Sequence, residues 1–136
     1  MEHLSITIGG LEFKARLETA LAPATCAAVL SRLPMQDKAI HVRWSGQAVW
    51  VPFGDEQFGV GFENATSYPA PGEIILYPGG VSETEILIAY GSVSFASKAG
   101  PLAGNHFMTI VSNQHLLPEV GRRVLWEGAQ DIVIRR

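Results

Sequence analysis

Apolar and polar residues alternate at the start of the chain, and this pattern predicts two β-strands. The alternation runs through Leu4–Ile8 and again through Leu11–Leu17, so one face of each strand is apolar and can be buried. Gly9-Gly10 separate the two segments, and glycine tolerates the positive φ that a two-residue hairpin turn requires. We therefore expect a β-hairpin to open the fold.

Short apolar runs separated by glycine, proline and polar residues predict further strands. The expected strands are Ala39–Trp44 and Gln47–Phe53, joined at Ser45-Gly46, and then Glu73–Tyr77, Glu85–Tyr90, His106–Val111 and Gln130–Ile134. Residues 55–71 show no period, so they are expected to form an irregular loop. Loops that a rigid sheet holds in place are where binding sites usually form.

Two segments have the spacing of short helices. In Ala22–Leu33 apolar residues recur at helical spacing, and Pro23 fits the first turn, where its missing N–H costs nothing. The second segment is Pro118–Trp126, with Gly128 as its C-terminal cap. Gly121 lies inside this segment and weakens the prediction by about 1 kcal/mol relative to alanine.

Length and composition indicate one mainly β domain over residues 1–136, with two short helices. The hydrophobic fraction is 47% and the charged fraction is 17%, as is typical of a folded globular chain. The low charged fraction has two explanations that stay open here. Either a homodimer or another homo-oligomer covers apolar surface, or the protein simply has a well-filled core.

Charge and cysteine content narrow the possible partners. The net charge is −3 and the pI is near 5.8, which argues against general nucleic-acid binding because that requires a basic face. No apolar run reaches the roughly 20 residues of a membrane helix, and no signal-like segment opens the chain. A single cysteine, Cys26, suits a reducing compartment. We expect a cytoplasmic protein with no nucleic-acid or membrane partner.

The order of the expected elements resembles the cyclophilin fold. A strand, a glycine turn, a strand and a helix that opens on Ala22-Pro23-Ala24-Thr25 are similar to its start. Ala99–Ile110 is similar to the segment before a central cyclophilin strand, and a short helix before the last strand also matches. The resemblance implies a closed or nearly closed β-barrel of eight strands that two helices cap.

A second resemblance covers nearly the whole chain. The motifs that carry it are YPAPG, YPGG followed by SETE, YG, GNHF and WEGAQDI. They resemble an uncharacterised prokaryotic family of small cyclophilin-like proteins, a domain of unknown function that is distant from true peptidyl-prolyl isomerases. This resemblance implies a fold but no activity.

The chain departs from the isomerases in their catalytic signature. That signature is Phe-His-Arg, then after several residues Phe and Gln-Gly-Gly, whereas His41-Val42-Arg43 is followed by no Gln-Gly-Gly here. Prolyl isomerisation needs an arginine poised over an apolar proline pocket, and Arg43 on an alternating strand is typical of a solvated residue outside the barrel. Because a fold carries no function by itself, the departure argues against isomerase activity.

Two groups of titratable residues are candidates for chemistry. His106 begins an apolar strand after Gly104-Asn105 and is the candidate general base, since histidine titrates near neutral pH; alternatively, it is structural and bonds a loop carbonyl. Glu83 and Glu85 are two residues apart and share one face of a strand. Paired carboxylates could hold a cation or raise one pKa, or they could form a solvated turn.

Residues near the strand ends make up the predicted binding site. The predicted ligand-binding residues are Glu63, Tyr68, Tyr77, Glu83, Asn105 and His106. We expect Asn105 and His106 at the mouth of a pocket that faces Glu83. Trp44, Trp50 and Trp126 could line a pocket or fill the core. The four histidines are scattered, so neither a metal site nor a cofactor is predicted.

Three functional classes remain open at this point. The leading hypothesis is a protein that binds a small organic molecule, or an accessory subunit of a catabolic enzyme, with a pocket formed by residues 55–71, the turn at residues 79–85 and Asn105-His106. The second is a hydrolase-like enzyme that uses His106 with Glu83 or Glu63. The third is a structural oligomerisation module. Ligand-dependent stabilisation without turnover would indicate a binding protein.

Overall fold

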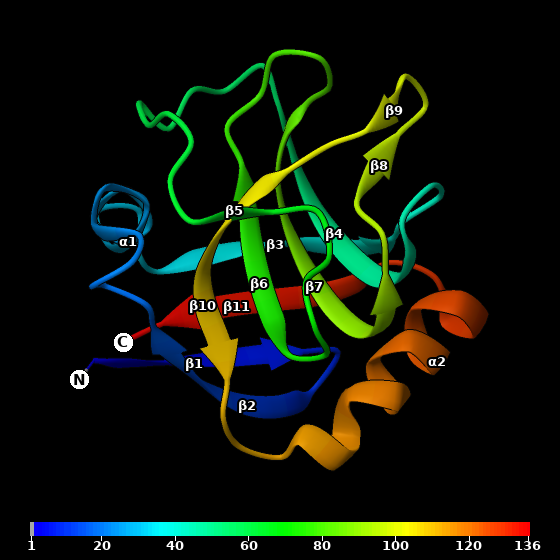
Figure 1. The fold of residues 1–136 in the computed structure, drawn as a ribbon. Helices are drawn as coiled ribbons and strands as arrows, with labels where there is room; N and C mark the ends of the chain where they lie inside the picture. Colours follow the sequence, from blue (N-terminus) through cyan, green and yellow to red (C-terminus); the bar gives the residue numbers. More distant parts are fainter. Residues whose placement is uncertain (1) are drawn as a thin grey trace.

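The computed structural model describes residues 2–136, which form two helices and a set of antiparallel strands (Figure 1). The elements are β1 (His3–Ile8), β2 (Leu11–Leu17), α1 (Pro23–Leu30), β3 (Met35–His41), β4 (Gly46–Gly54), β5 (Ala65–Thr66), β6 (Glu73–Tyr77), β7 (Thr84–Val93), β8 (Ala96–Ser97), β9 (Gly100–Pro101), β10 (Gly104–Ile110), the 3-10 turn η1 (Gln114–Leu116), α2 (Leu117–Glu127) and β11 (Gln130–Arg135).

Eight of the strands close into a barrel. Their order is β2-β1-β11-β3-β4-β7-β6-β10, and β10 pairs with β2 to complete the ring. The two-residue strand β5 adds to the side of β10, and β8 pairs with β9 in a small separate hairpin. The predicted mainly β fold with a closed barrel and two helices is confirmed.

The opening hairpin forms at the predicted turn. β1 and β2 pair in continuous register from His3↔Arg16 to Ile8↔Leu11. The residues between them, Gly9 and Gly10, have φ values of 54° and 84°. Side chains resist this left-handed region, so the two glycines fix where the chain reverses and therefore which residues of the hairpin face inward.

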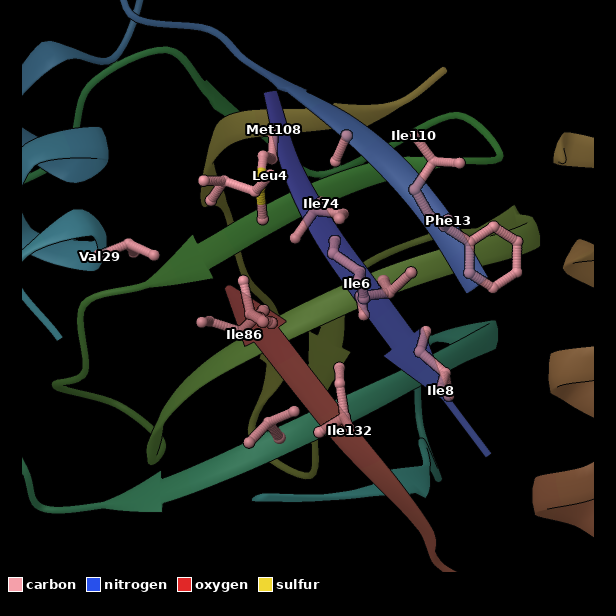
Figure 2. Packing of buried hydrophobic residues seen from close by; sticks show 14 of the residues in the cluster. Leu4, Ile6, Ile8, Phe13, Val29, Ile74, Ile86, Met108, Ile110 and Ile132 are labelled. Atoms are coloured by element: carbon pink, nitrogen blue, oxygen red, sulfur yellow. The ribbon is translucent and has the colours of Figure 1, made fainter. Parts of the chain in front are cut away.

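The barrel interior is filled by side chains from alternate strand positions. Leu4, Ile6 and Ile8 of β1 are almost completely buried, and Figure 2 shows them packed with residues of other strands such as Ile74 and Ile86. Apolar burial of this kind stabilises the fold by about 25 cal/mol per Å². A filled interior leaves no room for a ligand, so a binding site has to lie at the ends of the barrel or outside it.

A second apolar cluster lies on the opposite face of β6 and β7. Ile75 and Leu87 belong to this cluster, whereas their strand neighbours Ile74 and Ile86 belong to the interior. Phe95 and Leu102, which flank the β8–β9 hairpin, cover it from outside. This part of the sheet is therefore buried on both faces, which explains the continuous apolar run in β7.

The two helices differ in how well the sequence predicted them. α2 lies within a residue of the predicted segment at each end, and Gly128 follows it with a φ of 90°. α1 was predicted to reach Leu33 but ends at Leu30. After Leu30 the chain tightens into turns, in which the Arg32 amide donates to the Val29 carbonyl and the Leu33 amide to the Leu30 carbonyl, and Pro34 disfavours helical geometry at Leu33. Among the described residues, no helix is long and apolar enough to cross a membrane.

Candidate functional site

A cavity of about 300 Å³ lies on the outer face of the barrel, beside β8. Strands β3, β4 and β7 contribute to it, together with the loop between β3 and β4. Its lining residues are Ile40, Val42, Arg43, Trp44, Ser45, Trp50, Ser82, Glu83, Glu85, Ala96, Ser97 and Lys98. The volume is at the lower end of the range for sites that bind small organic molecules.

Strand alternation places an aromatic and an acidic side chain in this cavity. Trp50 pairs with Ile40 of β3 and with Leu87 of β7, so it shares the outer face on which Leu87 is packed. Glu85 lies two residues before Leu87 and therefore points to the same face. The positions of Trp50 and Glu85 thus follow from the barrel register, which makes them rigid parts of the site.

Hydrogen bonds at Ser45 hold one wall of the cavity in place. The Ser45 hydroxyl accepts from the Ala96 amide at 3.0 Å and lies 3.1 Å from the Ala96 carbonyl. The Ser94 amide also donates to the Ser45 carbonyl at 2.9 Å. These bonds join the β3–β4 loop to the start of β8, and they fix the backbone beside Trp44, whose side chain remains 57% exposed. A wall fixed in this way loses little freedom when a ligand binds.

Glu85 is the most unusual charged group in the cavity. The residue is only 6% exposed, and no hydrogen bond or ion pair from a residue between positions 2 and 136 reaches its carboxyl group. Burial, and then the nearby charge of Glu83, raise its pKa from 4.5 to about 8. The carboxyl group is therefore largely protonated at neutral pH and can donate a hydrogen bond as well as accept one. Of the alternatives that the sequence left open for Glu83 and Glu85, a raised pKa agrees with this arrangement, although burial contributes more than the second carboxylate.

Two basic side chains line the same cavity. Arg43 follows β3, and Lys98 lies in the turn between β8 and β9; both are exposed. Across the described chain, neither forms an ion pair with an acidic residue. The cavity thus combines two acids and two bases with the indole rings of Trp44 and Trp50.

Asn105 and Glu63 meet at a different place, at the start of α1. The Asn105 amide is completely buried and donates to the Thr25 hydroxyl at 3.1 Å and to the Gly61 carbonyl at 2.8 Å, while its oxygen accepts from the Glu63 amide at 3.1 Å. The Glu63 carboxylate accepts from the Thr25 amide at 2.6 Å and from its hydroxyl at 2.8 Å. This network fastens the 55–64 loop and the first turn of α1 to β10.

His106 lies on the other face of β10, where it bonds Thr109 of the same strand, and Thr109 in turn bonds Glu18 just after β2. The Thr109 hydroxyl donates to Glu18 at 2.6 Å, so the His106 Nε2 at 2.8 Å is the donor to Thr109. Burial raises the pKa of Glu18, but hydrogen bonds from Arg16 and Thr109 outweigh burial and hold it below its usual value. The nearest acidic group to His106 is Glu73, at 3.8 Å.

Tyr77 and Tyr68 occupy contrasting positions. Tyr77 is buried, its ring packs edge-on against Phe95 at 5.8 Å, and its phenol oxygen accepts from the Val81 amide at 3.0 Å. Tyr68 is 73% exposed on the loop before β6. Neither tyrosine lines the outer cavity.

The structure does not bring the predicted binding residues together in one pocket. Glu83 lines the outer cavity, and neither Asn105 nor His106 does so. Strand alternation separates Asn105, which faces inward, from His106, which faces outward. His106 also lies away from Glu83 across the sheet, since β6 stands between β10 and β7.

Sequence reasoning did not include Glu85, Arg43 or Lys98 in the binding set. The SETE motif was a usable signal for Glu85, since its two carboxylates share a face. Lys98 reaches the cavity only because the β8–β9 hairpin folds back against the sheet, and no local pattern encodes that contact.

Metal and thiol chemistry find little support in the described part of the chain. It contains no group of three or more histidine, cysteine or acidic residues that could hold a metal ion. Cys26 is buried, and burial followed by the charge of Glu63 raises its pKa to about 11. Its thiol, which donates to the Phe107 carbonyl, is therefore protonated at neutral pH and a poor nucleophile.

Comparison with protein families identifies the lineage. A model described as "Protein of unknown function (DUF3830)" matches residues 4–135. The chain belongs to this family. The match confirms the resemblance to an uncharacterised family, and it covers the whole outer cavity. Comparison with curated proteins gives no match.

Solved structures similar to this DUF3830 protein share its architecture. McbB in complex with tryptophan aligns with a TM-score of 0.74 and 16% identity over 98% of this chain and 44% of that chain. The hypothetical protein AF2241 from Archaeoglobus fulgidus aligns with a TM-score of 0.65 and 21% identity over 98% and 93%. A cyclophilin-type peptidyl-prolyl cis-trans isomerase of Cryptosporidium parvum aligns with a TM-score of 0.58 and 10% identity over 98% and 96%.

These likenesses confirm a cyclophilin-like fold. At such identities they carry no activity over to the DUF3830 chain, which spans less than half the length of the McbB chain. Isomerase activity is not favoured: the Gln-Gly-Gly of the isomerase signature is missing, and Arg43 lines a cavity that also contains Glu83 and Glu85.

Proposed function

We propose that this protein binds a small organic molecule in the outer cavity. The observation that carries the proposal is Glu85, a buried carboxyl group that lines the cavity without a hydrogen-bond partner from the described chain. Its carboxyl oxygens are still open to the cavity, because Arg32 Nε is the only fully buried side-chain polar atom without a partner in the described chain. A ligand in the cavity can therefore reach the Glu85 carboxyl group and supply the hydrogen-bond partner that the protein does not.

The aromatic residues indicate the shape of the ligand. Trp44 is largely exposed and Trp50 is half-buried, and both line the cavity. Flat aromatic walls favour ligands with a ring, which can stack against them. The structural neighbour McbB was solved in complex with tryptophan, and this supports the use of tryptophan and related indoles as the first probes.

A thermal-shift screen with matched variants tests the proposal. Indoles, amides and heterocyclic amines are added to the full chain, because a ligand of the native state raises its stability by about 2.7 kcal/mol at a hundredfold excess over Kd. We expect Trp44→Ala and Glu85→Gln to lose the stabilisation. Trp126→Ala removes a tryptophan that is 81% exposed on α2 and outside the cavity, so this variant should keep the ligand-dependent stabilisation.

Two outcomes would contradict the proposal. One is a screen in which no compound stabilises the wild-type protein. The other is a compound whose effect survives in both Trp44→Ala and Glu85→Gln, since its site would then lie elsewhere.

The hydrolase alternative has no comparable observation behind it. It needs His106 beside Glu63 or Glu83, but His106 bonds Thr109, and the Glu63 carboxylate bonds Thr25. If the wild-type protein turns over a substrate and His106→Ala does not, the enzyme is favoured. If the wild-type protein shows no turnover, the binding protein is favoured. We further propose a cytoplasmic location, which the single buried thiol of Cys26 supports, and a role as an accessory subunit remains compatible with a binding function.

A further inference from the structure

The charges around the outer cavity are of both signs and stay apart. Glu83 directly precedes β7 and Glu85 is its second residue, whereas Arg43 and Lys98 come from the β3–β4 loop and the β8–β9 turn. Within residues 2–136 none of these four groups forms an ion pair.

Elsewhere the same protein pairs its charges readily. On α2, Glu119 binds Arg122 at 2.7 Å and Arg123 at 2.9 Å. On the 55–64 loop, Glu56 binds Arg32 at 3.1 Å. The outer cavity therefore holds acidic and basic side chains that line one small site without pairing with one another.

We propose that the ligand is a zwitterion, whose cationic nitrogen binds Glu85 and Glu83 and whose carboxylate or similar oxyanion binds Arg43 and Lys98. This inference rests on the proposed small-molecule function and specifies its ligand class. A compact amino acid with a planar side chain fits the arrangement, with its ring against Trp44 and Trp50.

Only a ligand with both charges matches the acids and the bases of the cavity. A ligand with only a cationic group would leave Arg43 and Lys98 without partners, so these two residues would add nothing to the binding free energy. A ligand with only an anionic group can accept a hydrogen bond from the protonated Glu85, but it is repelled by Glu83 and brings no cation to the two acids. Charge-assisted hydrogen bonds are roughly twice as strong as neutral ones, so a ligand that satisfies both ends should be favoured at least tenfold over either half.

The protonation of Glu85 gives an independent readout. Its raised pKa means that the free protein holds a proton on this carboxyl group at pH 7, with Glu83, Arg43 and Lys98 as the charged groups around the same cavity. A bound ammonium group favours the ionised carboxylate. Binding of the zwitterion should therefore release a proton, which titrations in buffers of different ionisation enthalpy detect.

Four indole compounds separate the contributions of charge and ring. Tryptophan carries both charges, tryptamine only the cation, indole-3-propionate only the anion, and indole neither. Isothermal titration of the full chain at pH 7 should give tryptophan a Kd at least tenfold lower than that of each other compound. Glu85→Gln should bring tryptophan to the affinity of indole-3-propionate, and Lys98→Ala should bring it to that of tryptamine.

A matched control and a folding check accompany the variants. Lys14→Ala removes an exposed lysine on β2 outside the cavity, so it should leave all four affinities unchanged. Each variant is first melted without ligand, and a variant that is not folded is replaced by Glu83→Gln for the acids or Arg43→Gln for the bases.

The outcomes distinguish the two levels of the argument. If none of the four compounds binds, the proposed aromatic-lined site and the proposed zwitterionic ligand are both wrong. If indole or tryptamine binds as tightly as tryptophan, or if the Lys98 and Arg43 variants lose nothing, the cavity remains a binding site but the zwitterion is wrong. Binding of tryptophan without proton release would also contradict its contact with Glu85.

Discussion

Glu85 links the stability of the folded chain to pH. Burial and Glu83 raise its pKa from 4.5 to about 8, so between these values the folded state holds a proton that the unfolded chain releases. Below the pKa of the unfolded chain, Glu85 is protonated in both states and does not lower the stability. As the pH rises from the unfolded-state pKa towards the folded-state pKa, the free energy of unfolding falls by roughly 1.4 kcal/mol per pH unit.

Replacing Glu85 should remove this dependence. Glutamine has the shape of the protonated acid but does not titrate, so we expect Glu85→Gln to exceed wild type in stability at about pH 8 by several kcal/mol and to match it at about pH 5. Urea denaturation across this range measures the effect. Glu12→Gln, at an exposed position on β2, serves as the control and should keep the wild-type slope. Equal slopes for wild type and Glu85→Gln would show that the group titrates normally.

Gly121 is a residue whose role the sequence could not reveal. A Cβ at this position would lie 2.2 Å from the ring of Tyr90. That ring is held by its hydroxyl, which donates to His41 Nε2 at 2.8 Å, while His41 Nδ1 donates to the Val42 carbonyl at 2.7 Å. The glycine therefore allows α2 to approach the end of the barrel, although it weakens the helix.

Gly121→Ala should destabilise the protein by about 1 to 3 kcal/mol through overpacking, even though alanine favours the helix by about 1 kcal/mol. Chemical denaturation measures the change. A double-mutant cycle with Tyr90→Leu provides the control, because the alanine penalty should shrink when the smaller side chain is present. A stabilised Gly121→Ala protein would mean that the helix lies farther from Tyr90.

At the scale of elements, the buried Asn105 amide connects β10, the 55–64 loop and α1. It makes three hydrogen bonds and has no exposure to water. Asn105→Ala leaves the Gly61 carbonyl and the Glu63 amide without these partners, so we expect a loss of about 2 to 4 kcal/mol.

Hydrogen exchange tests whether this effect is local. Protection should fall first in residues 61–63 and in the first turn of α1, while the β1–β2 hairpin keeps its protection. Asn105→Asp retains an acceptor for the Glu63 amide, but it turns an oxygen toward the Gly61 carbonyl and buries a charge near the Glu63 carboxylate, so it should cost at least as much as Asn105→Ala. Uniform loss of protection would contradict a local clamp.

The sequence predicted elements well where a pattern was local. The Gly9-Gly10 turn and the amphipathic α2 are examples. It failed where pairing with a distant strand decides the outcome: β3 starts at Met35 although Gln36 to Lys38 show no alternation, because these residues pair with β11. The predicted binding site mixed two faces of β10 for the same reason, since its residues were chosen by position near strand ends and not by the face that each one occupies.

At the scale of the whole molecule, two large apolar side chains remain uncovered on α2. Leu125 is 59% exposed and Trp126 is 81% exposed, while only 17% of the residues are charged. Burial of such side chains in a symmetric contact would stabilise a pair of chains.

We expect a homodimer, and light scattering should therefore give about twice the chain mass of 14.7 kDa. Leu125→Glu should lower the mass towards that of one chain, because it would introduce a charge into the contact. A mass of one chain at every accessible concentration would show that the predicted homodimer does not form.

The closing seam of the barrel has a consequence for how the chain acquires its fold. β2 meets β10 over only three residue pairs, and the side chains that reinforce this seam, Glu18 and Thr109, are 91 positions apart. Bringing such distant segments together costs chain entropy before the contacts between them can form, so the barrel should close late in folding. Until then β2 and β10 present open edges, and a newly made chain is at its most prone to aggregation.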